Sequence, residues 1–273
     1  MFKLALEIIF LLQRKNAPKS KLRILHANDS LSYEVMQRGC YEQRYFRALD
    51  KYFTFSDKAI ALDVGANIGN HSVQFAETFS HVYSFEPVQQ NLRLLEVNCE
   101  NKNITVFNYG LSDKSNKFYI HYSDSNMGES VIADGNLKHV DLNNLDQKSE
   151  ITTKALDQVT IFKNVTNIEF IKIDIEGHEL SALRGMQKTL QRTMPVISLE
   201  IHKAEVVNGS TATIDFLRTL GYDTVLSPTK FAFNGNKASK FLKYIMEYFW
   251  RAKLSKVSRL KKTDYPFVFV MKS

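Results

Sequence analysis

A short turn that contains glycine follows an apolar run near residue 60 and carries groups that could bind a ligand. It reads Asp63-Val-Gly-Ala-Asn-Ile-Gly69, and a helical pattern follows it. Glycine permits a tight turn and lets the backbone approach a bound molecule closely. The turn has two glycines, whereas the dinucleotide fingerprint carries a third. Asp63 ends the preceding apolar run, where its carboxylate could attract a cationic ligand.

A second carboxylate stands at the end of the next apolar run, in Tyr83-Ser-Phe-Glu86-Pro87. A carboxylate about 20 residues beyond such a turn can accept hydrogen bonds from both ribose hydroxyls of an adenosine cofactor. S-adenosylmethionine (SAM) has no phosphate, but it carries an ammonium, a carboxylate and a sulfonium, so Asp63 suits its methionine end. The two motifs together predict a SAM site. A nicotinamide-binding protein is the alternative, and the absent third glycine disfavours it.

The elements that must position these motifs alternate from Ala59 onward, which is typical of an α/β domain with a mostly parallel sheet and helices on both faces. Strands are expected at Ala59–Val64, Val82–Glu86, Thr105–Asn108, Phe170–Ile175, Val196–Ile201, Thr224–Leu226 and Phe267–Met271. Helices are expected near Asn70–Thr78, Gln89–Cys99, Glu179–Leu190 and Thr211–Leu220.

We expect one domain over residues 59–273, preceded by a helical segment over residues 1–58 that acts as a cap or an interface. The apolar run at the N-terminus is interrupted by Glu7 and is shorter than the roughly 20 residues of a membrane span. Packing on the domain or on a second subunit of a homo-oligomer is expected, with a membrane surface as the alternative. Insertions at 113–168, with an extra strand at Lys117–Tyr122, and at 227–266 are candidate substrate-selecting elements.

The charge and the cysteines bear on the surroundings of the protein. The formal net charge is +7, and many basic residues lie between Lys237 and Lys262, where they alternate with aromatic ones. This pattern predicts a basic amphipathic helix, which could contact the inner face of a membrane or simply cover the core. Nucleic acid is disfavoured as a partner, because these residues lie outside the active-site motifs. Cys40 and Cys99 form no CxxC pair, which favours a reducing, cytoplasmic compartment.

The sequence resembles the FkbM-type methyltransferases, a SAM-dependent family known mainly for O-methylation of sugars and natural products. The resemblance covers about residues 38–203. It rests on Gly39-Cys-Tyr-Glu42, Leu62-Asp-Val-Gly-Ala-Asn-Ile-Gly69, Phe85-Glu-Pro87, Gly110-Leu-Ser-Asp113, Ala155-Leu-Asp157, Ile171-Lys-Ile-Asp-Ile-Glu-Gly-His-Glu179 and Leu199-Glu-Ile201.

The resemblance implies a class I SAM-methyltransferase fold, which is Rossmann-like and has a seven-stranded, mostly parallel sheet. It also implies SAM contacts at Asp63, Gly65, Asn67, Gly69, Glu86 and Asp174. We add the neighbouring Ala66, Asn70 and Pro87 as candidate cofactor contacts. The acceptor cannot be inherited from the family, because the match weakens at both ends of the chain.

Methyl transfer to a hydroxyl is an in-line displacement that needs a well-placed oxygen and is helped by a nearby base. Asp174, Glu176 and His202 follow neighbouring strands and are the candidate catalytic residues. The ordinary pKa of histidine is close to neutrality, which suits His202 as the base, with His178 as the competing choice. Asp174, Glu200 and His202 could also hold a divalent ion, but no metal site is predicted.

The function predicted from the sequence is a SAM-dependent O-methyltransferase that acts on a sugar hydroxyl of a glycan, a glycolipid or a glycosylated metabolite. One alternative is an RNA ribose methyltransferase. Another is a catalytically silent module that keeps the SAM fold and binds a partner.

Overall fold

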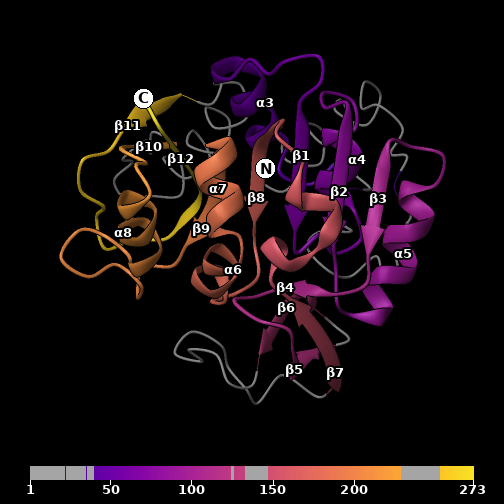
Figure 1. Ribbon diagram of the computed structural model, residues 1–273. Coiled ribbons are helices and arrows are strands. Elements are labelled where there is room, and N and C mark those ends of the chain that lie inside the picture. The colour runs from indigo at the N-terminus through magenta and orange to yellow at the C-terminus, as the bar shows by residue number, and fades with distance from the viewer. Residues whose placement is uncertain (1–21, 23–34, 36–39, 124–125, 133–146, 229–252) are drawn as a thin grey trace, which may run out of the picture.

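The computed structural model describes residues 22, 35, 40–123, 126–132, 147–228 and 253–273 (Figure 1). Most of the predicted N-terminal segment 1–58 lies outside the described residues. Its described part includes helix α3, Gln43–Tyr52. Within the described part of the chain, no helix is long and apolar enough to cross a membrane.

The main element is an eight-stranded sheet with the order β11-β10-β12-β9-β8-β1-β2-β3. Its strands are β1 (Ile60–Val64), β2 (His81–Phe85), β3 (Ile104–Phe107), β8 (Ile168–Ile173), β9 (Val196–Ile201), β10 (Thr224–Pro228), β11 (Leu254–Lys256) and β12 (Tyr265–Met271). Within this order, the five adjacent strands β9, β8, β1, β2 and β3 pair in parallel. Strand β12 is antiparallel to both β9 and β10. Every strand predicted from the sequence is present, and β11 adds a further edge strand.

Helices cover both faces of this sheet. They are α4 (Asn70–Phe75), α5 (Gln89–Cys99), α6 (Glu179–Gly185), α7 (Gln187–Thr193) and α8 (Ala212–Thr219), with the short 3-10 helices η2 (Leu156–Gln158) and η3 (Thr160–Lys163). Gly221 follows α8 with a φ of 98°, the left-handed conformation expected of glycine after a helix.

Alternation along the strands divides the core between the two faces, because successive side chains of a strand point to opposite sides. Leu62 and Val64 of β1 pack in one cluster with residues of α6, α7 and α8. Ala61, which precedes Leu62 and lies on the same face of the strand as Asp63, packs in a second cluster with residues of α3 and α4. Asp63 therefore faces the α3 and α4 side of the sheet.

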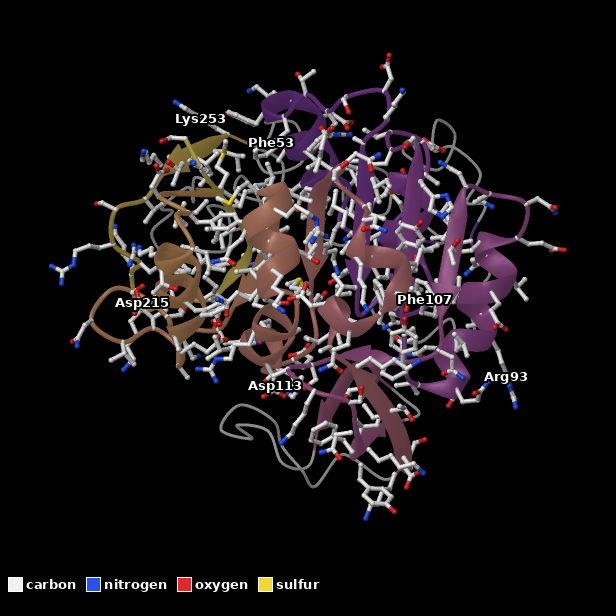
Figure 2. The ribbon with its side chains drawn as sticks, viewed as in Figure 1. Phe53, Arg93, Phe107, Asp113, Asp215 and Lys253 are labelled. Atoms are coloured by element: carbon white, nitrogen blue, oxygen red, sulfur yellow. The ribbon has the colours of Figure 1, made fainter. Side chains whose placement is uncertain are left out.

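The insertion 113–168 contributes most of a second, four-stranded sheet with the order β4-β7-β5-β6. The strands are β4 (Gly110–Leu111), β5 (Asn116–Ser123), β6 (Asn126–Ile132) and β7 (Gln147–Lys154). The extra strand predicted at Lys117–Tyr122 is confirmed as part of β5. Figure 1 shows this small sheet below the large one and beside α6. In Figure 2, Asp113, near the end of β4, lies toward the small sheet, whereas Phe53, which follows α3, lies in the upper part of the view.

The prediction of a basic helix within Lys237–Lys262 is wrong for the last part of this range, which is the part that the structure describes. Residues 229–252 lie outside the described residues, but Leu254–Lys256 form β11 and pair antiparallel with β10. Leu254 is buried, while Ser255 and Lys256 are exposed. Without β11, the backbone edge of β10 would be left unpaired. Pairing with that edge gives residues 254–256 an extended conformation in place of a helical one.

Candidate active site

The glycine turn brings the ends of three strands together. Gly65 has a φ of 84°, and the backbone N–H groups of Gly65 and Ala66 both donate to the carbonyl oxygen of Phe85 at 3.0 Å. A Cβ atom on Gly65 would lie 2.0 Å from the carbonyl oxygen of Asp174, which is shorter than any tolerated contact. Only glycine fits at this point, because both the backbone angle and the close approach exclude a side chain.

Asp63 lies fully buried directly before this turn. Its Oδ2 accepts a hydrogen bond of 2.6 Å from the Ser72 hydroxyl, which in turn accepts one of 2.8 Å from Ser84. Its Oδ1 is buried and has no hydrogen-bond partner among the described residues; it lies 4.0 Å from Nζ of Lys172. A buried carboxylate oxygen with unused acceptor capacity fits the cationic methionine end of SAM.

Glu86 lies at the end of β2, beside the turn, as predicted. Its carboxylate accepts backbone hydrogen bonds from Asn67 at 2.9 Å and from Val88 at 2.8 Å. Burial raises the pKa of Glu86 to about 7, although these hydrogen bonds act in the opposite direction. The Asn91 side chain is a third donor, which leaves about one of the four lone-pair positions of the carboxylate for a ribose hydroxyl. Pro87 packs beside Gly110, with its Cγ 3.5 Å from the place of a Cβ there.

The start of α4 is tied to the segment that precedes α3. The Asn70 amide accepts a hydrogen bond from the backbone N–H of Tyr41 at 2.9 Å and donates to its carbonyl oxygen at 3.2 Å. Oε2 of Glu42 lies 3.1 Å from Nε2 of His71. The contact of Asn70 with Tyr41 is therefore structural, and a direct contact with the cofactor stays a prediction.

The predicted catalytic residues lie beyond the ends of β8 and β9. The structure brings Glu176 and His202 together, with 3.3 Å between Oε2 and Nε2. Asp174 is hydrogen-bonded to Lys172 at 3.0 Å. Electrostatic interactions link Glu200 to Asp174, Glu176 and His202. Among the residues that the structure describes, no three His, Cys, Asp or Glu side chains are placed to hold a metal ion together.

The ionisation of His202 differs from the expectation. The hydrogen bond to Glu176 raises the pKa of His202 to about 9, and the nearby Glu200 carboxylate acts in the same direction. Burial, with the neighbouring Asp174 and Glu176 charges, raises the pKa of Glu200 to about 8. The raised pKa makes His202 less suited to accept a proton at neutral pH than an ordinary histidine, and its role as the base stays a prediction. At neutral pH this ring already carries the proton that a base would need to accept.

The loop between β8 and α6 also corrects one expectation. Helix α6 begins only at Glu179, and Glu176 has a φ of 47°, so these two residues do not share a helical face. The Glu179 carboxylate instead accepts hydrogen bonds from the backbone N–H groups of Gly177 at 3.0 Å and Ile175 at 3.3 Å. Burial raises its pKa to about 7. Glu179 therefore holds the loop that carries Asp174 and Glu176.

His178, the competing candidate base, lies next to the small sheet. Its Nε2 is 2.9 Å from the hydroxyl of Ser112, and its ring packs edge-on against Phe118 of β5. Burial lowers the pKa of His178. The ring is therefore neutral at physiological pH and joins the start of α6 to the insertion, whereas a catalytic role stays a prediction.

Lys172 is a functional candidate that the sequence reasoning did not include. Its side chain is 7% exposed and contacts the carboxylates of two predicted SAM contacts, Asp63 and Asp174. The signal in the sequence was a lysine inside the apolar run Ile171-Lys-Ile173. A lysine is almost never fully buried unless it is paired, so this position required carboxylate partners.

The strand order with its antiparallel β12, the glycine turn after β1 and the acidic end of β2 define the class I fold of SAM-dependent methyltransferases. A family model described as the methyltransferase FkbM domain matches residues 63–224, which is more than half of the chain. The chain belongs to the FkbM methyltransferase family.

Two characterised relatives share part of the sequence. Over 144 residues the chain is 33% identical to the hexuronic acid methyltransferase AglP of Haloferax volcanii, covering 51% of this chain and 54% of AglP. Over 203 residues it is 29% identical to the AMB antimetabolite synthetase AmbE of Pseudomonas aeruginosa, covering 60% of this chain and 10% of AmbE. The chain thus spans about half the length of AglP and a tenth of AmbE.

Solved structures resemble the chain more distantly. The methyltransferase FkbM from Methylobacillus flagellatus KT has a TM-score of 0.41 at 18% identity, covering 80% of this chain and 45% of that one. An O-methyltransferase from Bacillus cereus in complex with S-adenosylhomocysteine (SAH) has a TM-score of 0.42 at 12% identity, covering 84% of this chain and 80% of that one.

Proposed function

We propose that this protein is a SAM-dependent O-methyltransferase whose acceptor is a sugar hydroxyl in a glycan, a glycolipid or a glycosylated metabolite. The observation that carries the proposal is the pairing of two buried carboxylates with the glycine turn. Asp63 and Glu86 end neighbouring parallel strands, and Asn67 of the turn donates its backbone N–H to Glu86. Membership of the FkbM family supports the same chemistry.

The residues present fit the cofactor. Asp63 would hold the methionine end and Glu86 the ribose, while Gly65, Ala66, Asn67 and Gly69 form the turn between them. SAM, when bound, supplies a methyl group on a positively charged sulfur. We infer that Asp174, at the end of β8, adds negative charge near that methionine end. The similarity to a hexuronic acid methyltransferase supports a sugar as the acceptor.

The proton of the acceptor hydroxyl needs a destination during or after the transfer. We propose that the Glu176–His202 pair receives it, with Glu176 as the accepting carboxylate and the charged His202 ring holding Glu176 in place. The 3.3 Å contact and the raised pKa of His202 support this division of roles. Replacing Glu176 should then lower turnover more than it lowers SAM affinity.

The first experiment is titration calorimetry of the purified protein with SAM, SAH and NADH. Binding of SAM and SAH without NADH is the expected result. The Asp63→Asn and Glu86→Gln variants should weaken SAM binding, whereas Asp157→Asn, which removes a carboxylate that contacts α7, should not. Binding of NADH without SAM or SAH would contradict the SAM assignment and indicate a nicotinamide-dependent dehydrogenase instead.

The acceptor is then sought with SAM carrying a labelled methyl group. Nucleotide sugars, lipid-linked glycans and hexuronic acid derivatives form the panel, and RNA is included for the ribose alternative. On a sugar acceptor without amino groups, a labelled product that survives mild alkali is an ether formed on a hydroxyl, as proposed, whereas a product released by alkali is an ester formed on a carboxylate. SAM binding without transfer to any acceptor would favour the silent module.

A further inference from the structure

A row of polar side chains crosses the centre of the large sheet in register. Ser84, Asp63, Lys172 and Ser198 are direct neighbours on β2, β1, β8 and β9. Residues opposite each other on paired strands lie on the same face with their Cβ atoms about 5 Å apart. All four side chains are buried on the face that α3 and α4 cover. Lys172 is the one basic residue of this row, and its neighbours along β8, Ile171 and Ile173, are apolar.

Lys172 joins the row to the end of β8. Its Nζ lies 3.0 Å from Oδ2 of Asp174 and 4.0 Å from Oδ1 of Asp63. The exposed fractions of the three side chains are 7% for Lys172, 0% for Asp63 and 37% for Asp174. The cation is thus close to two carboxylates, one closed off from solvent and one partly open to it.

The charges around this group favour the ionised forms. Burial alone would lower the pKa of Lys172, but the carboxylates of Asp174, Asp63 and Glu42 together raise it above its usual value. Burial would likewise raise the pKa of Asp174, yet Lys172 lowers it on balance. Electrostatic interactions also link this cluster to titratable groups on the surrounding elements: Tyr45 of α3, His71 of α4, Glu86 beyond β2, Cys99 of α5, Glu179 of α6, Glu200 of β9 and His202 beyond it.

We propose that Lys172 is a positioning residue that acts through Asp63 and Asp174. It pairs with both carboxylates and holds them side by side before the cofactor arrives, and it cancels one of their two negative charges. The methionine end of SAM then meets a single net negative charge from these three groups. This inference rests on the proposed function in naming SAM as the ligand, but its effect on the carboxylates does not depend on any ligand.

The ligand-free test is the thermal stability of a Lys172→Gln variant, which keeps a hydrogen-bond donor for Asp174 and loses the charge. Without the cation, the pKa of Asp174 rises in the folded protein, so the variant loses stability relative to the wild type as the pH rises through that pKa. The Tm gap between wild type and variant should widen by roughly 3 °C or more from about pH 5 to about pH 8. Lys256→Gln, on the exposed edge strand β11, should show no such widening.

A Tm gap that is equal at both pH values would overturn the proposal. If the variant does not fold near neutrality, folding at low pH or after the added Asp174→Asn substitution would support the same conclusion more strongly. Failure to fold under every one of these conditions would point to a packing role for Lys172 and count against the proposal.

The ligand test compares SAM with SAH, which lacks the positive charge on sulfur. Loss of the Lys172 charge makes the site more negative, so at about pH 8 the ratio of the SAH Kd to the SAM Kd should rise by roughly threefold or more. A purely structural role would weaken both ligands by the same factor, which is the contrary result. If the wild type binds neither ligand, the cofactor assignment fails, and the ligand-free Tm gap still decides the role of Lys172.

Discussion

Replacing Glu176 by glutamine removes the carboxylate that pairs with His202 and keeps the size of the side chain. The two side chains are 25% and 31% exposed, and their pairing atoms are 3.3 Å apart. A pKa of about 9 for His202, against an ordinary value of about 6.5, corresponds to roughly 3 kcal/mol at 1.36 kcal/mol per pH unit. Because solvent reaches both side chains, screening reduces the expected contribution of the pair to about 1 kcal/mol.

The pH dependence of this contribution has a definite sign. The pKa of His202 is higher in the folded protein than in the unfolded chain, so the stabilisation is fully present below about pH 6.5. It is lost as the pH rises through about 9. The difference in unfolding free energy between wild type and Glu176→Gln should therefore be constant in mildly acidic solution and approach zero above that pKa. Urea unfolding at a series of pH values measures it.

The direct assay is an NMR titration of the His202 ring, identified by the signal that disappears in His202→Asn. We expect a wild-type midpoint well above 8 and a midpoint lower by roughly one pH unit or more in Glu176→Gln. The matched control is Glu205→Gln: Glu205 accepts the backbone N–H of His202 at 2.9 Å and raises the pKa of the ring less than Glu176 does, so this variant should lower the midpoint less. A wild-type midpoint near 6.5, or one that Glu176→Gln leaves in place, would refute the reasoning.

Three further predictions concern the turn, the ribose carboxylate and a distant control. Gly65→Ala should lose roughly 3 kcal/mol of unfolding free energy in urea, because its Cβ would meet the Asp174 carbonyl oxygen at 2.0 Å and its φ is 84°. For the wild type, SAM affinity measured by calorimetry should weaken as the pH falls through about 7, because Glu86 then becomes protonated. The Glu86→Gln variant should bind SAM at least about tenfold more weakly, and its affinity should not show this pH dependence. Asp157→Asn should cost about 1–2 kcal/mol of unfolding free energy, since the carboxylate accepts hydrogen bonds from the backbone N–H and hydroxyl of Thr189, while calorimetry should show unchanged SAM affinity. Unaltered stability of Gly65→Ala, or a pH dependence retained in Glu86→Gln, would contradict the corresponding assignment.

Local pattern in the sequence was sufficient for the elements and for the cofactor turn. Each strand of the large sheet except β11 was marked by apolar residues, which either alternate with polar ones or form a continuous run. The glycines marked the turn. These features depend on neighbours in the chain, such as the positive φ that Gly65 and Gly69 allow. The strand β11 was missed because its conformation comes from pairing with β10, a partner far away in the sequence.

The side-chain chemistry, by contrast, was decided by the tertiary structure. The sequence placed Asp174, Glu176 and His202 at one edge of the sheet, but only the folded chain sets Glu176 beside His202 and thereby raises the histidine pKa. Likewise, the sequence shows Lys172 only as a lysine within an apolar run, and its partner is set when β8 pairs with β1 and brings it opposite Asp63. Charge interactions depend on separation in space and on burial, and neither quantity is fixed by spacing along the chain.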